Sequence, residues 1–263
     1  GAMEGVKYFL VPNVKNFSWM TVVAAMGQMF YSLSIAMGIL ITFGSYMKKE
    51  TSLEDSTRNV EVFDTAIAIM AGLMIIPAVF SFSGGDPDTL QAGPALMFIT
   101  IPKVFENMGF GTVVGILFFL LVLFAAVTSS IALTESAVST FEDELGWSRR
   151  RATVLVGVIM IALGSLSSLG YGPLVGIKII GMQFLDFFDF LTNSVMMPIA
   201  AMLTSLFVSR IVGMKRMEEE IMHGESTFRR KKIFIVMIKY LCPVFALIIL
   251  ISSVANAFGW IAM

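Results

Sequence analysis

A short uncharged stretch near the amino end carries the residues best suited to binding. Residues 27–38 read Gly-Gln-Met-Phe-Tyr-Ser-Leu-Ser-Ile-Ala-Met-Gly and place the hydroxyls of Ser32 and Ser34 between two glycines. They lie inside about 29 residues, from Trp19 to Met47, that contain no charge. Hydroxyls at this depth of an apolar helix either bond back to carbonyls one turn earlier or bind a ligand. Composition alone leaves both interpretations open.

Three other polar positions are surrounded by apolar sequence. Asp64 has no Lys or Arg in its own apolar stretch, and a carboxylate inside a bilayer costs about 2.5–3.5 kcal/mol, so a bound metal ion or proton is its expected partner. The alternative is that Asp64 reaches the membrane interface. Residues 128–130, Thr-Ser-Ser, offer the hard oxygen atoms that small cations take as ligands, although close helix packing explains the same small residues. Glu135 is a further candidate for a buried charge.

The elements that must position these residues are membrane helices. With 57% hydrophobic and 14% charged residues, and a mean hydropathy of +0.84, the chain is too apolar for a soluble domain of its length. Six apolar stretches are long enough to cross about 30 Å of hydrocarbon. They are residues 19–47, 61–83, 111–141, 151–170, 187–212 and 233–258. The sequence therefore predicts an all-α membrane protein with six transmembrane helices.

The distribution of basic residues predicts the orientation of these helices. If the loop containing Lys48 and Lys49 is cytoplasmic, fourteen of the Lys and Arg residues fall inside and four outside, which places both ends of the chain outside. The outer loop at 84–110 carries a mixed apolar run and is expected to form a lid on the outer face. The inner segment from Glu218 to Lys232 is charged and is expected to be solvated.

Several classes of function are excluded by what the sequence lacks. With one cysteine, Cys242, and one histidine, His223, an internal disulfide and a zinc cluster are impossible. We find no dinucleotide-binding or P-loop motif, no nucleic-acid signature, and no nucleophile beside a base. We therefore expect no enzyme and no nucleic-acid partner. The first residue is not methionine, and we expect further sequence upstream.

The whole chain resembles the carboxy-terminal half of the neurotransmitter:sodium symporters, in particular bacterial amino-acid transporters of that family. The resemblance rests on four motifs: residues 27–38 with Ser45-Tyr46, residues 98–102, residues 124–131, and Glu142-Asp143-Glu144-Leu145. It implies helices six to eleven of the inverted-repeat, leucine-transporter-like fold, with the first of them broken near its middle. It also implies that five amino-terminal helices of the same transporter are missing, and that the protein lies in a bacterial cytoplasmic membrane.

The resemblance assigns ion ligands to the polar residues. Ser32 and Asp64 match the first sodium site, where the family usually has an asparagine in place of Asp64. Ala125, Thr128 and Ser129 match the second. Each of the two Na+ sites would be only half present in this chain. Because Asp64 can be both an ion ligand and a fixed negative charge, the resemblance implies transport that needs no chloride.

The resemblance also implies a substrate pocket and an outer gate. Tyr31, Ser34, Met37, Ser129 and Leu133 match substrate-binding positions. The gate positions are Gln28, Phe30 and Asp189, and the family's gate also uses an arginine that this chain lacks.

Met37 replaces a more common aromatic residue, and Ala36 replaces a common glycine. A flexible thioether adapts to several side-chain shapes, so we expect loose selectivity for hydrophobic or aromatic amino acids.

The function implied is sodium-coupled symport of a neutral amino acid by alternating access, with sodium ions, the amino acid and the bilayer as partners. Two alternatives stay open. One is a proton-coupled exchanger on the same fold, in which Asp64 or Glu135 carries the proton. The other is a half-length membrane subunit that does not transport.

Overall fold

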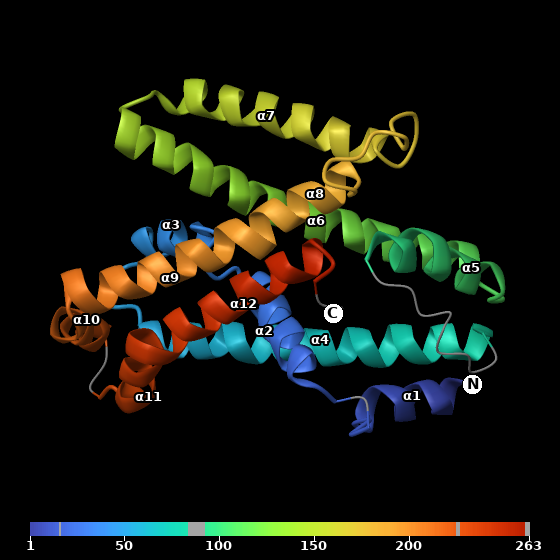
Figure 1. Cartoon of the computed structure of the whole chain (residues 1–263), viewed down its shortest axis with the longest axis horizontal. Helices are drawn as coiled ribbons and strands as arrows, with labels where there is room; N and C mark the ends of the chain where they lie inside the picture. The colour runs from blue at the N-terminus through green and yellow to red at the C-terminus, as the bar shows by residue number, and fades with distance from the viewer. Residues whose placement is uncertain (16, 84–92, 225–226, 261–263) are drawn as a thin grey trace. The chain divides into compact units, whose positions relative to one another are not determined.

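In the part of the chain described by the computed structural model, helices are the main regular element, with one isolated bridge between Ile179 and Met182 (Figure 1). The description covers residues 1–15, 17–83, 93–224 and 227–260. The chain divides into two compact units. Unit 1 is Gly1–Phe17 with Asn59–Ser130, and unit 2 is Ser18–Arg58 with Ile131–Met263.

Unit 1 is built on the long helix α4 (Leu53–Ser83), most of which belongs to it. The short helix α1 (Ala2–Leu10) packs on the carboxy-terminal end of α4, where the ring centroids of Tyr8 and Phe80 are 5.1 Å apart. A Cβ atom on Gly5 would lie 2.7 Å from the Cα of Pro77, so glycine is what lets the two backbones approach.

The rest of unit 1 leads from the predicted lid into α6. Residues 84–92 of that loop lie outside the described residues, and the remainder forms η2 (Leu96–Thr100) and α5 (Ile101–Glu106). Helix α6 (Gly111–Leu145) follows, and its first part belongs to unit 1. The Phe105 ring packs edge-on against the Phe118 ring, with the two ring centroids 5.5 Å apart. This contact packs α5 against α6.

Unit 2 contains the two halves of the first predicted span and most of the later helices. Its elements are α2 (Trp19–Ser32), α3 (Ile39–Ser45), the end of α6, α7 (Arg149–Leu169), α8 (Phe184–Asp189), η3 (Phe190–Met196), α9 (Met197–Phe207), η4 (Val208–Val212), α10 (Met214–Ile221), η5 (Met222–Gly224), α11 (Lys231–Val236), η6 (Met237–Leu241) and α12 (Cys242–Ala257).

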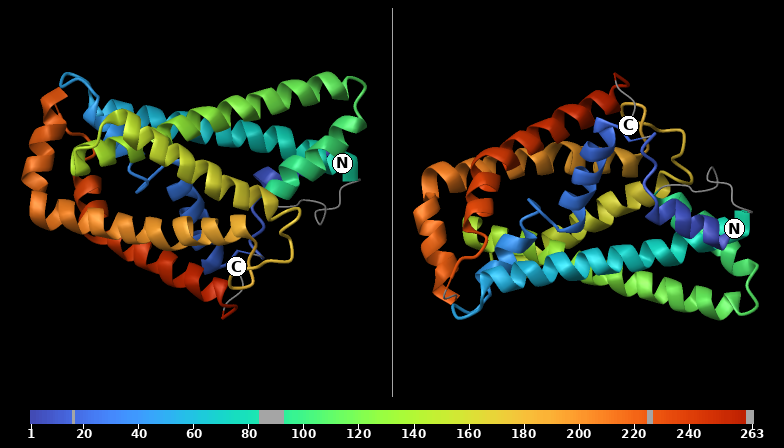
Figure 2. Two further views of the ribbon diagram at one scale, coloured as in Figure 1. Left: turned by 90° about the horizontal axis from the view of Figure 1, so that it is seen from above. Right: turned by 90° about the horizontal axis from the view of Figure 1, so that it is seen from below.

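Two helix pairs hold unit 2 together. Val138 of α6 packs with Ala152 and Val156 of α7 in a small buried cluster. Helices α9 and α12 lie side by side, as both views of Figure 2 show. The buried hydroxyl of Ser205 donates to the carbonyl of Ile238 and fixes the register of that second pair.

Three of the π-helical turns end just before a proline. Pro102, Pro198 and Pro243 each stand at the first positions of an α-helix, directly after η2, η3 and η6. Proline cannot donate a backbone hydrogen bond, and its ring crowds the carbonyl four residues earlier. A wider turn relieves that clash without ending the helix, which explains why the helix continues through each proline.

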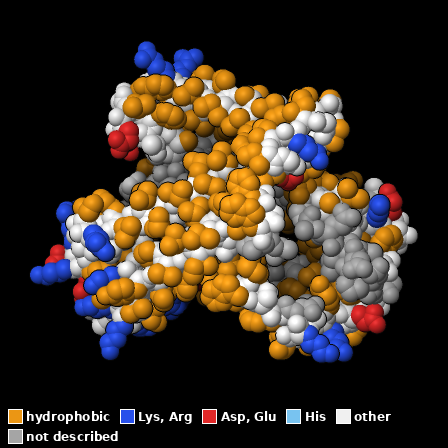
Figure 3. All heavy atoms as spheres, in the orientation of Figure 1, with side chains coloured by type: hydrophobic (Ala, Val, Ile, Leu, Met, Phe, Trp, Pro, Cys, Tyr) orange, Lys and Arg blue, Asp and Glu red, His pale blue; other side chains and the backbone are white. Residues whose placement is uncertain are grey.

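Five helical stretches are long and apolar enough, by length and composition, to cross a membrane: Leu53–Ser83, Gly111–Leu145, Arg149–Leu169, Phe184–Val212 and Lys231–Ala257. The first predicted span is divided between α2 and α3, which confirms the expected break near its middle. Figure 3 shows hydrophobic side chains over most of the visible face of α9 and α12, as a surface in contact with lipid requires.

Candidate functional site

The break in the first span is made by a left-handed backbone. Between the end of α2 and the start of α3, Ser34, Ala36 and Gly38 have φ angles of 54°, 64° and 81°. A glycine adopts this conformation without a penalty, whereas an L-residue with a side chain costs about 1–2 kcal/mol. Ser34 and Ala36 therefore adopt this conformation at a steric cost.

The break leaves backbone oxygens available. The amide of Ser34 donates to the carbonyl of Tyr31 at 3.0 Å and that of Ile35 to Phe30 at 2.9 Å, which closes α2. The next regular bond runs from Thr42 to the carbonyl of Gly38. Within the part of the chain that the structure describes, the carbonyls of residues 33–37 accept no hydrogen bond. These oxygens can accept from an ammonium group or bind a cation.

The hydroxyl of Ser34 makes no hydrogen bond to any other described residue. The interpretation that it bonds back to a carbonyl one turn earlier is therefore wrong for Ser34. Its side chain is half-buried beside the open carbonyls, as are those of Phe30 and Met37. The Ser34 hydroxyl, the Met37 thioether and the open carbonyls of residues 33–37 thus belong to one short segment.

Close packing against α6 holds the break on its carboxy-terminal side. The hydroxyl of Thr42 lies 3.4 Å from the hydroxyls of both Ser136 and Ser139. A Cβ atom on Gly38 would lie 2.7 Å from the Ser136 oxygen, so glycine is required there both for its φ angle and for the close approach. Thr42 and Ser136 are buried, which makes this a firm anchor for α3.

Glu135 is a paired carboxylate. The Tyr46 hydroxyl donates to Glu135 Oε1 at 2.7 Å, and the Arg149 guanidinium contacts Glu135 Oε2. Arg149 also bonds Glu142 at 3.2 Å. Sequence reasoning found Glu135 but missed its partner, because Arg149 lies beyond the apolar stretch and only the turn from α6 into α7 brings it back.

The residues predicted for the second sodium site share one turn of α6 in unit 1. The Thr128 hydroxyl donates to the carbonyl of Ala125 at 2.9 Å. Thr128 and Ser129 are both exposed within the chain. The hydroxyl of Thr128 keeps its lone pairs free to act as a ligand after making this bond.

The predicted first sodium site and the substrate site draw on both units. Ser32 belongs to unit 2, whereas Asp64 lies half-buried on the part of α4 that belongs to unit 1. Tyr31, Ser34, Met37 and Leu133 belong to unit 2 and Ser129 to unit 1. Tyr31 and Leu133 are exposed within the chain.

The predicted gate residues lie in unit 2. Gln28 is exposed on α2. Asp189, at the end of α8, accepts a hydrogen bond from the Asn193 side chain. It borders a cavity of about 230 Å³ whose polar lining residues are Asp186, Asp189, Ser194, Ser253 and Asn256. The predictions did not include Asn193 or the α12 residues, since nothing in their spacing pairs them with Asp189.

A tyrosine lies beside the start of α8. Partial burial, together with the neighbouring Asp186 carboxylate, raises the pKa of the Tyr171 hydroxyl.

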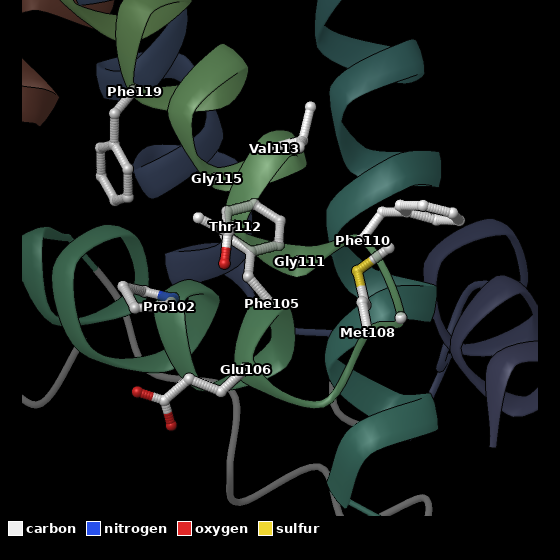
Figure 4. Close-up of a pocket in the computed structure, with 11 residues that line it drawn as sticks. Pro102, Phe105, Glu106, Met108, Phe110, Gly111, Thr112, Val113, Gly115 and Phe119 are labelled. Atoms are coloured by element: carbon white, nitrogen blue, oxygen red, sulfur yellow. The ribbon is translucent and has the colours of Figure 1, made fainter.

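A second concavity lies in unit 1, and none of the residues that line it is a predicted ligand. Figure 4 shows this cavity of about 430 Å³ between α5 and the first turns of α6, lined by Pro102, Phe105, Thr112 and Phe119 among others. Its lining combines apolar side chains with polar groups, among them Glu106 and Thr112. Groups of three or more His, Cys, Asp or Glu able to hold a metal ion are absent from the described residues.

Comparison with known proteins identifies the family of the chain. The sequence model of the sodium:neurotransmitter symporter family matches residues 1–259. The chain is 34% identical over 226 residues to the uncharacterized sodium-dependent transporter YhdH of Bacillus subtilis, a match that covers 86% of this chain and 49% of that protein. It is 32% identical over 254 residues to an uncharacterized sodium-dependent transporter of Haemophilus influenzae, covering 96% of this chain and 54% of the other.

A solved structure is similar over nearly the whole chain. The crystal structure of MhsT in complex with L-phenylalanine matches with a TM-score of 0.83 at 34% identity, covering 96% of this chain and 57% of that one. The chain thus spans about half the length of the curated relatives that it matches.

Proposed function

The chain belongs to the sodium:neurotransmitter symporter family, and we propose that it takes part in sodium-coupled uptake of a neutral amino acid across a bacterial cytoplasmic membrane. The observation that carries the proposal is the open backbone between α2 and α3, where the carbonyls of residues 33–37 accept no hydrogen bond from the described residues. Unwound backbone at mid-membrane is where transporters of this architecture bind substrate and ions. The relatives are transporters, which agrees with the prediction that the chain is no enzyme.

Two sodium ions are the proposed coupling ions. Ser32 and Asp64 would bind the first, and the Ala125 carbonyl with Thr128 and Ser129 the second. The hydrogen bond from Thr128 to Ala125 supports the second assignment, because it places a hydroxyl and a carbonyl oxygen together on one helix turn. Since the matched relatives are about twice as long as this chain, we expect other segments to supply further ligands.

Chloride independence is proposed on the charge of Asp64. A carboxylate at an ion site balances the charge of the bound cation, so that no anion is needed for neutrality. The human relative named as a sodium- and chloride-dependent GABA transporter is more distant, at 26% identity.

The proposed substrate is a hydrophobic or aromatic amino acid. Its amine would lie on the open carbonyls near Ser34, and its side chain against Tyr31, Met37, Ser129 and Leu133. MhsT was crystallised with L-phenylalanine, which supports an apolar side chain. Gln28, Phe30 and Asp189 would close the pocket from outside, and rocking of one helix bundle against the other would expose it alternately to each side.

The energy available is sufficient for such uptake. At about 100 mV, each entering sodium ion gains about 2.3 kcal/mol from the voltage and about 1.4 kcal/mol from a tenfold gradient. Two ions therefore supply about 7.4 kcal/mol, enough to concentrate a zwitterion on the order of 10⁵-fold. No covalent step is needed.

Uptake into vesicles tests the proposal. The full-length protein is reconstituted into liposomes, and accumulation of labelled L-phenylalanine is followed with an inward sodium gradient and without chloride. We expect accumulation that disappears when potassium replaces sodium. Equal uptake with a proton gradient in sodium-free buffer would instead favour the proton-coupled exchanger.

A further inference from the structure

Two π-helical turns lie against each other at one end of the α9–α12 pair. Turn η4 carries Arg210 and turn η6 carries Lys239, and the two turns are in contact. The hydrogen bond from Ser205 to the carbonyl of Ile238 fixes the antiparallel register beside them. Both basic residues therefore lie near the same end of one helix pair. π-Helical turns within α-helices occur frequently at functional sites.

These cations have no carboxylate partner among the residues that the structure describes. Arg210, Lys232 and Lys239 are exposed, and none forms an ion pair with another described residue. Lys231 differs, because its ammonium pairs with Glu218. The Lys239 ammonium lies over the Tyr240 ring, 5.3 Å from its centroid.

Because of where these residues lie in the helices, their lack of an ion pair among the described residues needs an explanation. Arg210 and Lys239 both fall within the stretches that can cross a membrane, and Lys239 lies about 10 Å along the helix from Lys232, inside the apolar sequence. A cation there is costly unless its side chain extends to the interface, where water and anionic headgroups can solvate it. Figure 3 shows blue side chains gathered at this end, over α10 and α11. The positive-inside pattern places this end on the cytoplasmic side.

We propose that Arg210 and Lys239, with Lys232, bind the phosphate headgroup of an anionic phospholipid from the cytoplasmic leaflet. A guanidinium matches two phosphate oxygens at once, and lysine side chains extend toward the headgroup layer. Basic pockets between transmembrane helices on this side bind anionic headgroups, and Tyr240 has the amphipathic ring typical of the same layer. The proposal does not depend on the transported substrate.

Lipid binding to the full-length protein tests the proposal. Delipidated protein in detergent is titrated with phosphatidylglycerol, and bound lipid is counted by native mass spectrometry. We expect saturable binding that weakens about thirty-fold in the variant Arg210→Gln/Lys239→Gln. Phosphatidylcholine is expected to bind no more than the background, and 10 mM inorganic phosphate is expected not to compete.

A matched variant separates a site from general surface charge. Arg150→Gln/Arg151→Gln removes the same charge from two exposed residues at the start of α7, which also lack ion pairs among the described residues. We expect it to bind lipid as the wild type does. Equal weakening in both variants, or equal binding of phosphatidylcholine, would overturn the proposal, as would competition by free phosphate. Circular dichroism and the melting temperature show that each variant is folded before it is compared.

Discussion

The broken span between α2 and α3 and the polar turn of α6 both place oxygen atoms in apolar helices, but they use different parts of the chain. The break opens the backbone, and the carbonyls of residues 33–37 become the available groups. Helix α6 stays continuous, and side-chain hydroxyls such as that of Thr128 are the available groups. The first arrangement depends on backbone conformation and the second on residue type. Substitutions should therefore affect them differently.

The largest effect is expected at Gly38. Gly38→Ala places a side chain at a φ of 81° and within 2.7 Å of the Ser136 oxygen. We expect the free energy of unfolding to fall by about 2–4 kcal/mol, from backbone strain and overpacking together. Thermal unfolding in detergent measures it.

Gly27→Ala is the matched control for Gly38→Ala. It lies within α2 with no atom in contact range of an added Cβ, so we expect unchanged or slightly higher stability. Equal destabilisation by the two substitutions would show that the break has no special need for glycine.

Thr128→Val tests whether the side-chain hydroxyl on α6 is an ion ligand. Valine has nearly the shape of threonine and leaves α6 intact, since the hydroxyl bonds only the carbonyl of Ala125 among the described residues. We expect stability to change little and the sodium concentration for half-maximal uptake to rise about tenfold. Thr128→Ser keeps the hydroxyl and should return this sodium concentration to the wild-type value. An unchanged sodium dependence for Thr128→Val would remove this residue from the second site.

Asp64→Asn tests whether the first ion site needs the negative charge of Asp64 as well as its oxygen ligand. The amide keeps an oxygen ligand but removes the negative charge. We expect the affinity for sodium to fall several-fold in chloride-free buffer and to recover when chloride is added. Sodium-driven uptake at several chloride concentrations provides the measurement. Full sodium affinity without chloride in this variant would contradict chloride independence based on Asp64.

The smallest effect is expected at Ala36. Ala36→Gly removes the penalty of a side chain at a φ of 64°, but the unfolded chain gains freedom with the added glycine. We expect a net gain of about 0.5 kcal/mol in the free energy of unfolding, detectable as a small rise in melting temperature. A loss of more than 1 kcal/mol would mean that the alanine methyl group packs favourably.

The sequence supported the helical membrane fold because long apolar stretches allow few other structures. It also supported a broken first span, because residues 27–38 resemble a family with that break. The left-handed φ of Ala36 could not be foreseen, since alanine favours helix and only the surrounding structure imposes the strain. The partner of Glu135 was missed for a related reason. The turn between α6 and α7 brings Arg149 to it, and apolar periodicity does not describe that turn.

Substrate binding in two salt solutions tests whether sodium ions and the open carbonyls bind the substrate together. Binding of labelled L-phenylalanine to the full-length protein is measured in detergent, in sodium chloride and in potassium chloride of equal strength. We expect saturable binding in sodium that is lost in potassium, because the substrate needs both the ions and the open carbonyls. Equal binding in the two salts, with a folded protein in each, would contradict it.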